Sequence, residues 1–184
     1  MIIQELFPTN LIVHECDFDL EQLEKECLEY KENHESINKS GKDSYQLYEY
    51  KNEKLENVIK DCIVKSQRDD RPFKSINIDS WVNINPPGSY NIMHQHGSYQ
   101  GVFLSSVFYV KTPEDCGNIR FYDPRRDICG ATDMVYYNNG DIYMWVKPMV
   151  NNLLLFPSWL WHDVEPNDSK ENRISISSNI FVEW

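Results

Sequence analysis

Apolar residues in the N-terminal part of the chain recur at the spacing of an α-helix. Between Asp19 and Asn33 they lie three or four positions apart, and Asp19 with Gln22 resembles a capping box at the start of a helix. A second apolar stripe runs from Leu55 to Ile63, after a polar stretch from Ser36 to Ser44. One stripe per segment is typical of a helix that buries a single face. The pattern predicts two amphipathic helices packed on the outside of a sheet.

From Lys74 onward, apolar and polar residues alternate with a period of two, as in a β-strand. The segment from Ile76 to Asn85 has one mostly apolar face and one face of polar residues and tryptophan. Asn139-Gly140 is typical of a two-residue hairpin turn. Further strands are predicted at Gly101–Val110, Asn118–Tyr122, Val135–Tyr137, Ile142–Val146, Asn152–Phe156 and Arg173–Val182. Many short strands preceded by helices predict a mainly β fold with flanking N-terminal helices, a jelly roll or barrel-like sandwich.

The length of the chain limits the number of domains. A chain of 184 residues is long enough for one well-filled core and short for two. We therefore expect a single domain spanning residues 1–184. Residues 1–73 would form its helical support and residues 74–184 its β core.

The composition predicts a protein of the cytoplasm. No apolar run approaches the roughly 20 residues that a membrane span needs, and the segment from Met1 to Pro8 lacks the basic and apolar parts of a signal peptide. The 5 cysteines are an odd number without CxxC spacing, which argues against a disulfide framework or a zinc knuckle. We expect reduced thiols and no association with a membrane.

The charge of the chain bears on its partners. A formal net charge of −11 repels the phosphate backbone of nucleic acids and anionic lipids. Arg120, Arg125 and Arg126 form the one candidate basic patch in the second half of the sequence. A nucleic-acid partner is therefore disfavoured.

Three of the 5 histidines lie in contexts that suggest a metal site. His94 and His96 flank a single residue, so on an extended segment both imidazoles point to the same side. His162 follows a predicted strand, and a returning strand can bring such a distant ligand to the same ion. The alternative is that these are surface or packing residues, as we expect for His14 and His34.

The last predicted strand has a polar face that carries an arginine. Arg173, Ser175, Ser177 and Asn179 share this face. A guanidinium can bind a carboxylate through two parallel hydrogen bonds, and the Ser175 hydroxyl can donate to the same group. We expect Arg173 and Ser175 to bind an anion in a cavity. The alternative is a structural salt bridge from Arg173 to one of the 29 acidic residues.

Taken in order, the motifs of the C-terminal part resemble those of the 2-oxoglutarate and Fe(II)-dependent dioxygenases. More narrowly, the chain is similar to a group of small oxygenases of bacteria and their phages. The resemblance covers roughly Trp81 to Trp184. It rests on His94-Gln95-His96, Gly117-Asn118-Ile119-Arg120-Phe121-Tyr122, Leu155-Phe156-Pro157-Ser158 leading to His162, and Arg173-Ile174-Ser175.

The resemblance implies a cupin-like double-stranded β-helix with Fe(II) held by His94, His96 and His162. Members of the family use an HxD or HxE pair and a distal histidine, so His96 stands in place of the usual carboxylate. A neutral ligand changes the electronic properties of the metal, which leaves halogenation as an alternative to hydroxylation. Asp123 or Asp163 could supply the carboxylate instead, but strand geometry does not favour either. We therefore keep His96 as the expected ligand.

The resemblance also implies how the cosubstrate binds. Arg173 and Ser175 match the residues that hold the far carboxylate of 2-oxoglutarate in the family. Tyr109 lies where a tyrosine often supports this cosubstrate, and we include Asn83 among the expected cosubstrate-binding residues. The implied reaction hydroxylates a substrate with dioxygen and releases succinate and CO2.

Two other functions stay open at this level. A cupin-type dioxygenase with three histidine ligands would use the same fold without 2-oxoglutarate, and would have no need for Arg173 and Ser175. A jelly-roll binding module would bind no stoichiometric metal. The substrate of an oxygenase could be a small molecule or a protein side chain, because the loops decide specificity in this architecture. A homodimer is expected only from the frequency of twofold assemblies.

Overall fold

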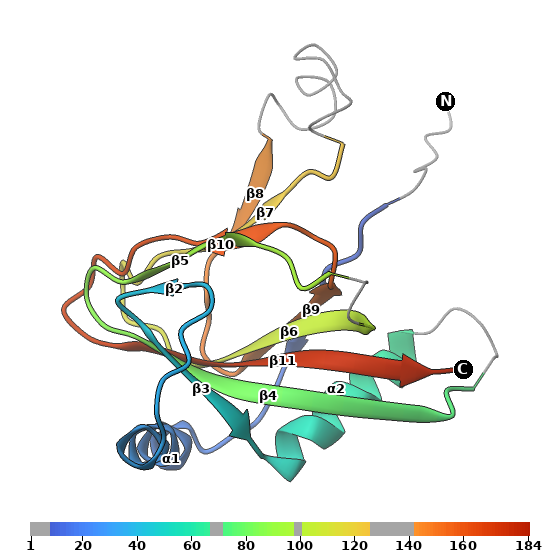
Figure 1. The fold of residues 1–184 in the computed structure, drawn as a ribbon, viewed down its shortest axis with the longest axis horizontal. Helices are drawn as coiled ribbons and strands as arrows, with labels where there is room; N and C mark the ends of the chain where they lie inside the picture. Colours follow the sequence, from blue (N-terminus) through green and yellow to red (C-terminus); the bar gives the residue numbers. More distant parts are fainter. Residues whose placement is uncertain (1–7, 67–71, 98–100, 126–141) are drawn as a thin grey trace.

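The computed structural model describes residues 8–66, 72–97, 101–125 and 142–184. Within these ranges the chain forms two helices and eleven strands (Figure 1). Both helices precede most of the strands along the chain. In chain order the elements are β1 (Ile12–Glu15), α1 (Leu20–Asn33), β2 (Gly41–Lys42), β3 (Tyr45–Tyr50), α2 (Glu53–Ser66), β4 (Ser75–Asn85), β5 (Tyr90–His94), β6 (Val102–Lys111), β7 (Ile119–Tyr122), β8 (Tyr143–Val146), β9 (Asn152–Pro157), β10 (His162–Val164) and β11 (Arg173–Glu183).

Both predicted helices are present, and each begins after a polar residue that caps it. The Asp19 side chain accepts a hydrogen bond of 3.1 Å from the backbone N–H of Gln22 at the start of α1. The Gln22 side chain donates to Glu26 from Nε2, and the return bond of the predicted capping box, from the Asp19 backbone N–H to the Gln22 side chain, is not found between these two described residues. At the start of α2 the Asn52 side chain accepts from the backbone N–H of Leu55. The buried faces consist of Leu23 and Cys27 on α1, and of Leu55, Ile59, Cys62 and Ile63 on α2.

The larger sheet has six strands in the order β1-β9-β6-β11-β4-β3. Its central strand β11 pairs with β4 from Arg173, opposite Asn85, to Glu183, opposite Ser75. On its other side β11 pairs with β6. One face of the sheet packs against both helices, which lie on the same side of it (Figure 1). The core on that side includes Ile174, Ile176 and Ile180 of β11.

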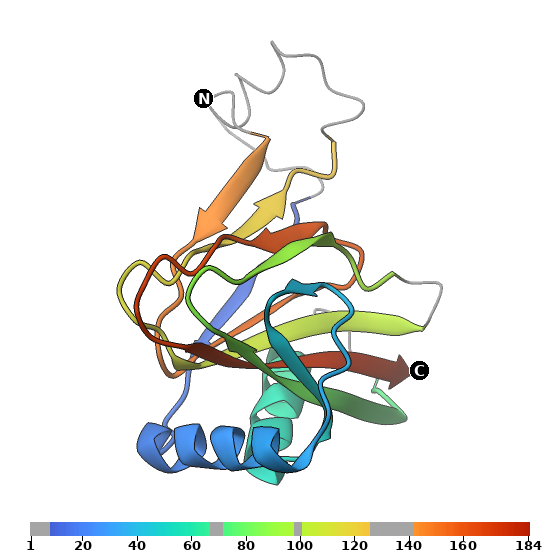
Figure 2. The same cartoon turned by 60° about the vertical axis from the view of Figure 1, so that its left-hand side comes forward.

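The smaller sheet has the order β2-β5-β10-β7-β8 and lies on the side of the larger sheet away from the helices (Figures 1 and 2). Neighbouring strands in both sheets are mostly not consecutive in the chain, as in a jelly roll. A second apolar cluster joins the sheets, with members Val107, Tyr109, Leu154 and Phe156 from the larger sheet and Ile119 and Phe121 from the smaller one. The predicted mainly β fold with flanking N-terminal helices, a double-stranded β-helix, is confirmed.

The structure also shows strands that the sequence pattern did not predict. β1, β2 and β3 come from residues 1–73, the part expected to be helical. The short strands β5 and β10, which carry His94 and His162, were not predicted as strands either. The predicted strand Val135–Tyr137 and the turn at Asn139-Gly140 lie outside the described residues. Among the described residues, no helix has the length and hydropathy needed to cross a membrane. The assignment of residues 1–184 to a single domain stays a prediction.

Candidate metal centre and anion site

The pairing of two strands of the smaller sheet brings the three predicted histidines together. His162, the first residue of β10, lies opposite His94, the last residue of β5. His96 follows two residues later, and its backbone N–H donates to the Ser158 carbonyl at 2.8 Å. The ring centroids of His94 and His162 are 4.4 Å apart, and that of His96 lies 5.3 Å from His162. One nitrogen of each ring lies within 4.8 Å of the others, a spacing that suits three ligands of one metal ion.

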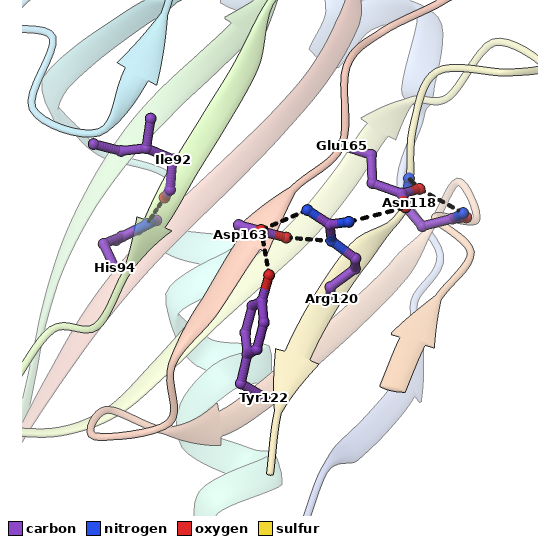
Figure 3. Close-up of polar contacts among 7 residues, drawn as sticks. All are labelled: Ile92, His94, Asn118, Arg120, Tyr122, Asp163 and Glu165. Atoms are coloured by element: carbon purple, nitrogen blue, oxygen red, sulfur yellow. Dashed lines mark hydrogen bonds and ion pairs between the residues drawn. The ribbon is translucent and has the colours of Figure 1, made fainter. Parts of the chain in front are cut away.

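A carbonyl oxygen fixes the tautomer of each imidazole. His94 Nδ1 lies 2.7 Å from the Ile92 carbonyl oxygen (Figure 3), and His162 Nδ1 lies 2.9 Å from the Leu160 carbonyl oxygen. His96 Nδ1 is hydrogen-bonded to the side-chain oxygen of Asn179. These oxygens can only accept, so each Nδ1 carries the proton and each Nε2 keeps a free lone pair. The donor set therefore fits a metal ion bound by three Nε2 atoms.

Burial keeps these imidazoles in the neutral form that binds metals. Desolvation lowers the pKa of His94 below its ordinary value. It lowers the pKa of His96 to about 4, an effect that the Asn179 hydrogen bond partly opposes. Burial also lowers the pKa of His162, and the neighbouring His94 and His96 lower it further. At neutral pH no proton has to leave before a metal binds.

Arg173 carries a buried positive charge that is not balanced by a neighbouring carboxylate among the described residues. The residue is 2 % exposed, and burial lowers the pKa of its guanidinium. Its Nη1 donates to the carbonyl oxygens of Cys116 at 2.6 Å and Gly117 at 3.4 Å. Within the described ranges no acidic side chain lies at ion-pair distance of Arg173, so the alternative of a structural salt bridge is not found there. A buried charge of this kind requires an anionic partner.

The other predicted cosubstrate residues lie beside Arg173 in one cavity between the sheets. In the larger sheet, Ser175 of β11 pairs with Tyr109 of β6 on one side and with Asn83 of β4 on the other. All three residues line the cavity, together with Arg173 and the three histidines. Burial raises the pKa of Tyr109, so its hydroxyl is a donor at neutral pH. The Asn83 amide is already engaged, since it accepts from Trp81 Nε1 at 3.2 Å and donates to the Ser177 hydroxyl at 2.8 Å. The contact of Asn83 with a cosubstrate stays a prediction.

The two carboxylates considered as alternative ligands point elsewhere. Asp163 faces away from its neighbour His162 along the strand, toward β7, where it accepts from Arg120 Nε and Nη2 at 2.7 Å each (Figure 3). The Tyr122 hydroxyl donates to the same carboxylate at 2.7 Å (Figure 3). Asp123 accepts from Arg125 Nε at 2.9 Å and Nη2 at 2.6 Å. Neither carboxylate belongs to the cluster of potential metal ligands.

Two features of the site carry no clear signal in the sequence. One is the pair of carbonyl groups, at Cys116 and Gly117, that orient Arg173. The other is Asn179, which the strand alternation placed on the polar face of β11 without indicating its partner. Both depend on contacts between distant parts of the chain, so the alternation of residues in one segment cannot reveal them.

Comparison with known proteins agrees with this geometry. The sequence model of a family described as "Putative 2OG-Fe(II) oxygenase" matches residues 79–179. That range contains the three histidines, Arg173 and Ser175. A search of curated protein sequences found no significant match.

Several solved structures share the fold at low sequence identity. A prolyl-4-hydroxylase from Pseudomonas putida is 14 % identical, with a TM-score of 0.66, over 94 % of this chain and 92 % of that one. HygX from Streptomyces hygroscopicus, with nickel and 2-oxoglutarate bound, is 10 % identical, with a TM-score of 0.63, over 94 % and 83 %. A prolyl hydroxylase from Trichoplax adhaerens, in complex with a peptide fragment, is 14 % identical, with a TM-score of 0.65, over 93 % of this chain and 83 % of that one.

Proposed function

Since the chain belongs to the family of 2OG-Fe(II) oxygenases, we propose that it hydroxylates a substrate at the site formed by its three histidines and Arg173. Its cofactor is Fe(II) and its cosubstrate is 2-oxoglutarate. In this proposal His94, His96 and His162 hold the metal through their Nε2 atoms. Arg173 and Ser175 hold the far carboxylate of the cosubstrate, and Tyr109 supports it.

The observation that carries the proposal is the environment of Arg173. Its guanidinium is buried in the same cavity as the histidines, and the described residues provide carbonyl groups but no carboxylate to balance its charge. A dicarboxylate that reaches from the metal to the guanidinium would supply the missing anion. In a cupin-type dioxygenase without 2-oxoglutarate, the arginine would need an anionic substrate as its partner instead.

The residues around the site have separate tasks. The guanidinium orients one end of the cosubstrate, with the Ser175 and Tyr109 hydroxyls as further donors. The ring centroids of Phe156 and His162 lie 4.9 Å apart. Apolar side chains such as Phe156 limit the access of water to the site. When bound, iron and 2-oxoglutarate supply an oxidation of the substrate that releases succinate and CO2.

Hydroxylation is favoured over halogenation by the number of protein ligands. If all three clustered histidines hold the metal, a cosubstrate bound through two atoms and dioxygen would take the remaining positions, and none would be left for a halide. As a ligand, His96 would hold the position that a halide needs. We therefore infer that a hydroxyl group is transferred to the substrate.

The class of substrate and the compartment are parts of the same proposal. The Trichoplax structure holds a peptide fragment, and another structure of HygX holds hygromycin B. We propose a small molecule or a protein side chain as the substrate, in the cytoplasm. The net charge of −11 disfavours a nucleic acid, and a homodimer stays an expectation.

Anaerobic titration of the Fe(II)-loaded protein with 2-oxoglutarate tests the proposal. We expect a saturable visible charge-transfer band from the wild type, no iron binding by His94→Ala, and a band only at much higher 2-oxoglutarate concentration in Arg173→Ala. Lys111→Ala is the matched control, because it removes another cation of the larger sheet that pairs with Glu24 and Glu171 outside the cavity. Bound iron without a band in the wild type would favour the cupin-type dioxygenase.

A further inference from the structure

The three histidines differ in how their rings are held. His94 and His162 each donate from Nδ1 to the backbone carbonyl two residues earlier, those of Ile92 and Leu160. These two rings are therefore oriented by their own strand segments. His96 does not follow this rule, because its Nδ1 is hydrogen-bonded to the side chain of Asn179, which lies on the other sheet.

Stacking alone cannot orient the His96 ring. The Trp81 ring lies against it, with centroids 5.8 Å apart and planes inclined by 26°. Trp81 is itself supported by Tyr48 and by a hydrogen bond to Asn83. A stacked neighbour sets the plane of an imidazole. A ring rotated by half a turn about its Cβ–Cγ bond keeps the same plane and stacks equally well, but it presents its other edge to the metal. Only a hydrogen bond selects which nitrogen faces the metal.

We propose that Asn179 is a positioning residue, which selects the tautomer and orientation of His96 and so presents Nε2 to the metal. The inference rests on the proposed ligand set. Asn179 shares its face of β11 with Arg173 and Ser175. One strand then positions a ligand of the metal and also provides the residues that bind the cosubstrate.

Two substitutions of Asn179 distinguish the effect of its hydrogen bond from the effect of its side-chain volume. Asn179→Leu keeps a similar volume and removes the acceptor, whereas Asn179→Asp keeps an acceptor oxygen. Ser178→Ala is the matched control. Ser178 is the adjacent residue on the opposite face of β11, where its hydroxyl is buried against that of Ser80 at 2.9 Å.

The first measurement needs no metal. Imidazole nitrogen chemical shifts in the metal-free, full-length protein distinguish a protonated from an unprotonated ring nitrogen. We expect His96 to carry its proton on Nδ1 in the wild type and in Asn179→Asp, and to populate both tautomers in Asn179→Leu. A wild-type His96 protonated on Nε2 would overturn the inference, whatever the fate of the variants.

The second measurement is the affinity for Co(II), used as a probe that does not oxidise readily in air. We expect Asn179→Leu to bind Co(II) about 10- to 100-fold more weakly than the wild type, the usual effect of removing a partner of a ligand. Asn179→Asp should regain most of this loss, and Ser178→Ala should match the wild type. If Asn179→Leu binds as tightly as the wild type, or Asn179→Asp as weakly as Asn179→Leu, the inference is wrong.

His94→Ala separates this inference from the proposed function. Loss of Co(II) binding in His94→Ala together with wild-type binding in Asn179→Leu would reject the role of Asn179 and leave the ligand set in place. Retention of Co(II) by His94→Ala would reject the ligand set, and the positioning role with it.

Discussion

Two of the three histidines and the arginine of the site are oriented by the main chain. Carbonyl groups of Ile92 and Leu160 accept from two of the histidines, and that of Cys116 accepts from Arg173. A backbone carbonyl group remains in place when the side chain of the same residue is substituted. The orientation of the two histidines and of Arg173 should therefore tolerate many substitutions at the residues that provide these carbonyl groups. Substitutions that move the backbone itself should have larger effects.

Gly117 is the residue at which such a backbone change is easiest to make. Its φ is +84°, and an added Cβ would lie 2.5 Å from the Glu165 carbonyl oxygen and 2.6 Å from that of Pro166. Gly117→Ala therefore has to shift the segment whose carbonyl groups hold Arg173. We expect a loss of stability of about 1–3 kcal/mol and weaker binding of 2-oxoglutarate, measured by thermal unfolding and by titration.

Gly88→Ala is the control for Gly117→Ala. Gly88 has a φ of +80°, but an added Cβ would meet no atom within 4 Å. Gly88→Ala should lower the free energy of unfolding only by the conformational cost of the left-handed backbone, roughly 1–2 kcal/mol. Its binding of 2-oxoglutarate should match that of the wild type. Equal loss of 2-oxoglutarate binding in both variants would show that crowding at Gly117 does not act on Arg173.

Among the secondary-structure elements, the central strand β11 packs against the helices with one face and lines the site with the other. The isoleucines of β11 pack toward the helices, while Arg173, Ser175 and Asn179 face the other sheet. The helices thus support the larger sheet from the side opposite to the site (Figure 1). Changes in a helix should alter the stability of the protein more than the chemistry of the site.

The N-cap of α1 provides a test of this separation. Asp19→Ala removes the acceptor for the Gln22 N–H and should lower the free energy of unfolding by about 1 kcal/mol. The affinity for Co(II) should not change, because α1 contributes no residue to the cavity. Chemical denaturation and metal titration measure the two effects. Asp17→Ala, an exposed aspartate before the cap, is the control, and weaker metal binding in Asp19→Ala would contradict the separation.

At the scale of the whole molecule, the site joins the two sheets. The predicted metal ligands lie on or beside strands of the smaller sheet, whereas Arg173, Ser175 and Asn179 belong to the larger one. A metal ion that binds only the folded chain stabilises the whole arrangement by mass action. Removing the metal should therefore affect global unfolding and not only activity.

We expect Co(II) to raise the midpoint of thermal unfolding. At a free metal concentration of about 100 times Kd the stabilisation is roughly 2.7 kcal/mol, and a chelator should reverse it. His162→Ala should abolish the shift, because its ring is one of the three clustered histidines. His14→Ala, an exposed histidine on β1, should retain it. An equal shift in the wild type and His162→Ala would place the metal elsewhere.

The fold could be predicted where the signal is local. Helical spacing identified α1 and α2, and alternation identified the long strands such as β4 and β11, because each buries one continuous face. The short strands β1, β2, β3, β5 and β10 could not be predicted in this way. A few residues carry too little periodicity, and such strands form because a neighbouring strand offers hydrogen-bond partners.

The sequence by itself determined which side chains are available for chemistry: the HxH pair, the distal His162, and an arginine followed by a serine on one strand face. The tertiary structure alone decided that Asp163 turns toward Arg120, that Arg173 is held by carbonyl groups, and that Asn179 reaches His96. The physical reason is the range of the interactions. Spacing along a strand sets which residues share a face, whereas contacts between strands depend on a register that only the packed sheets define.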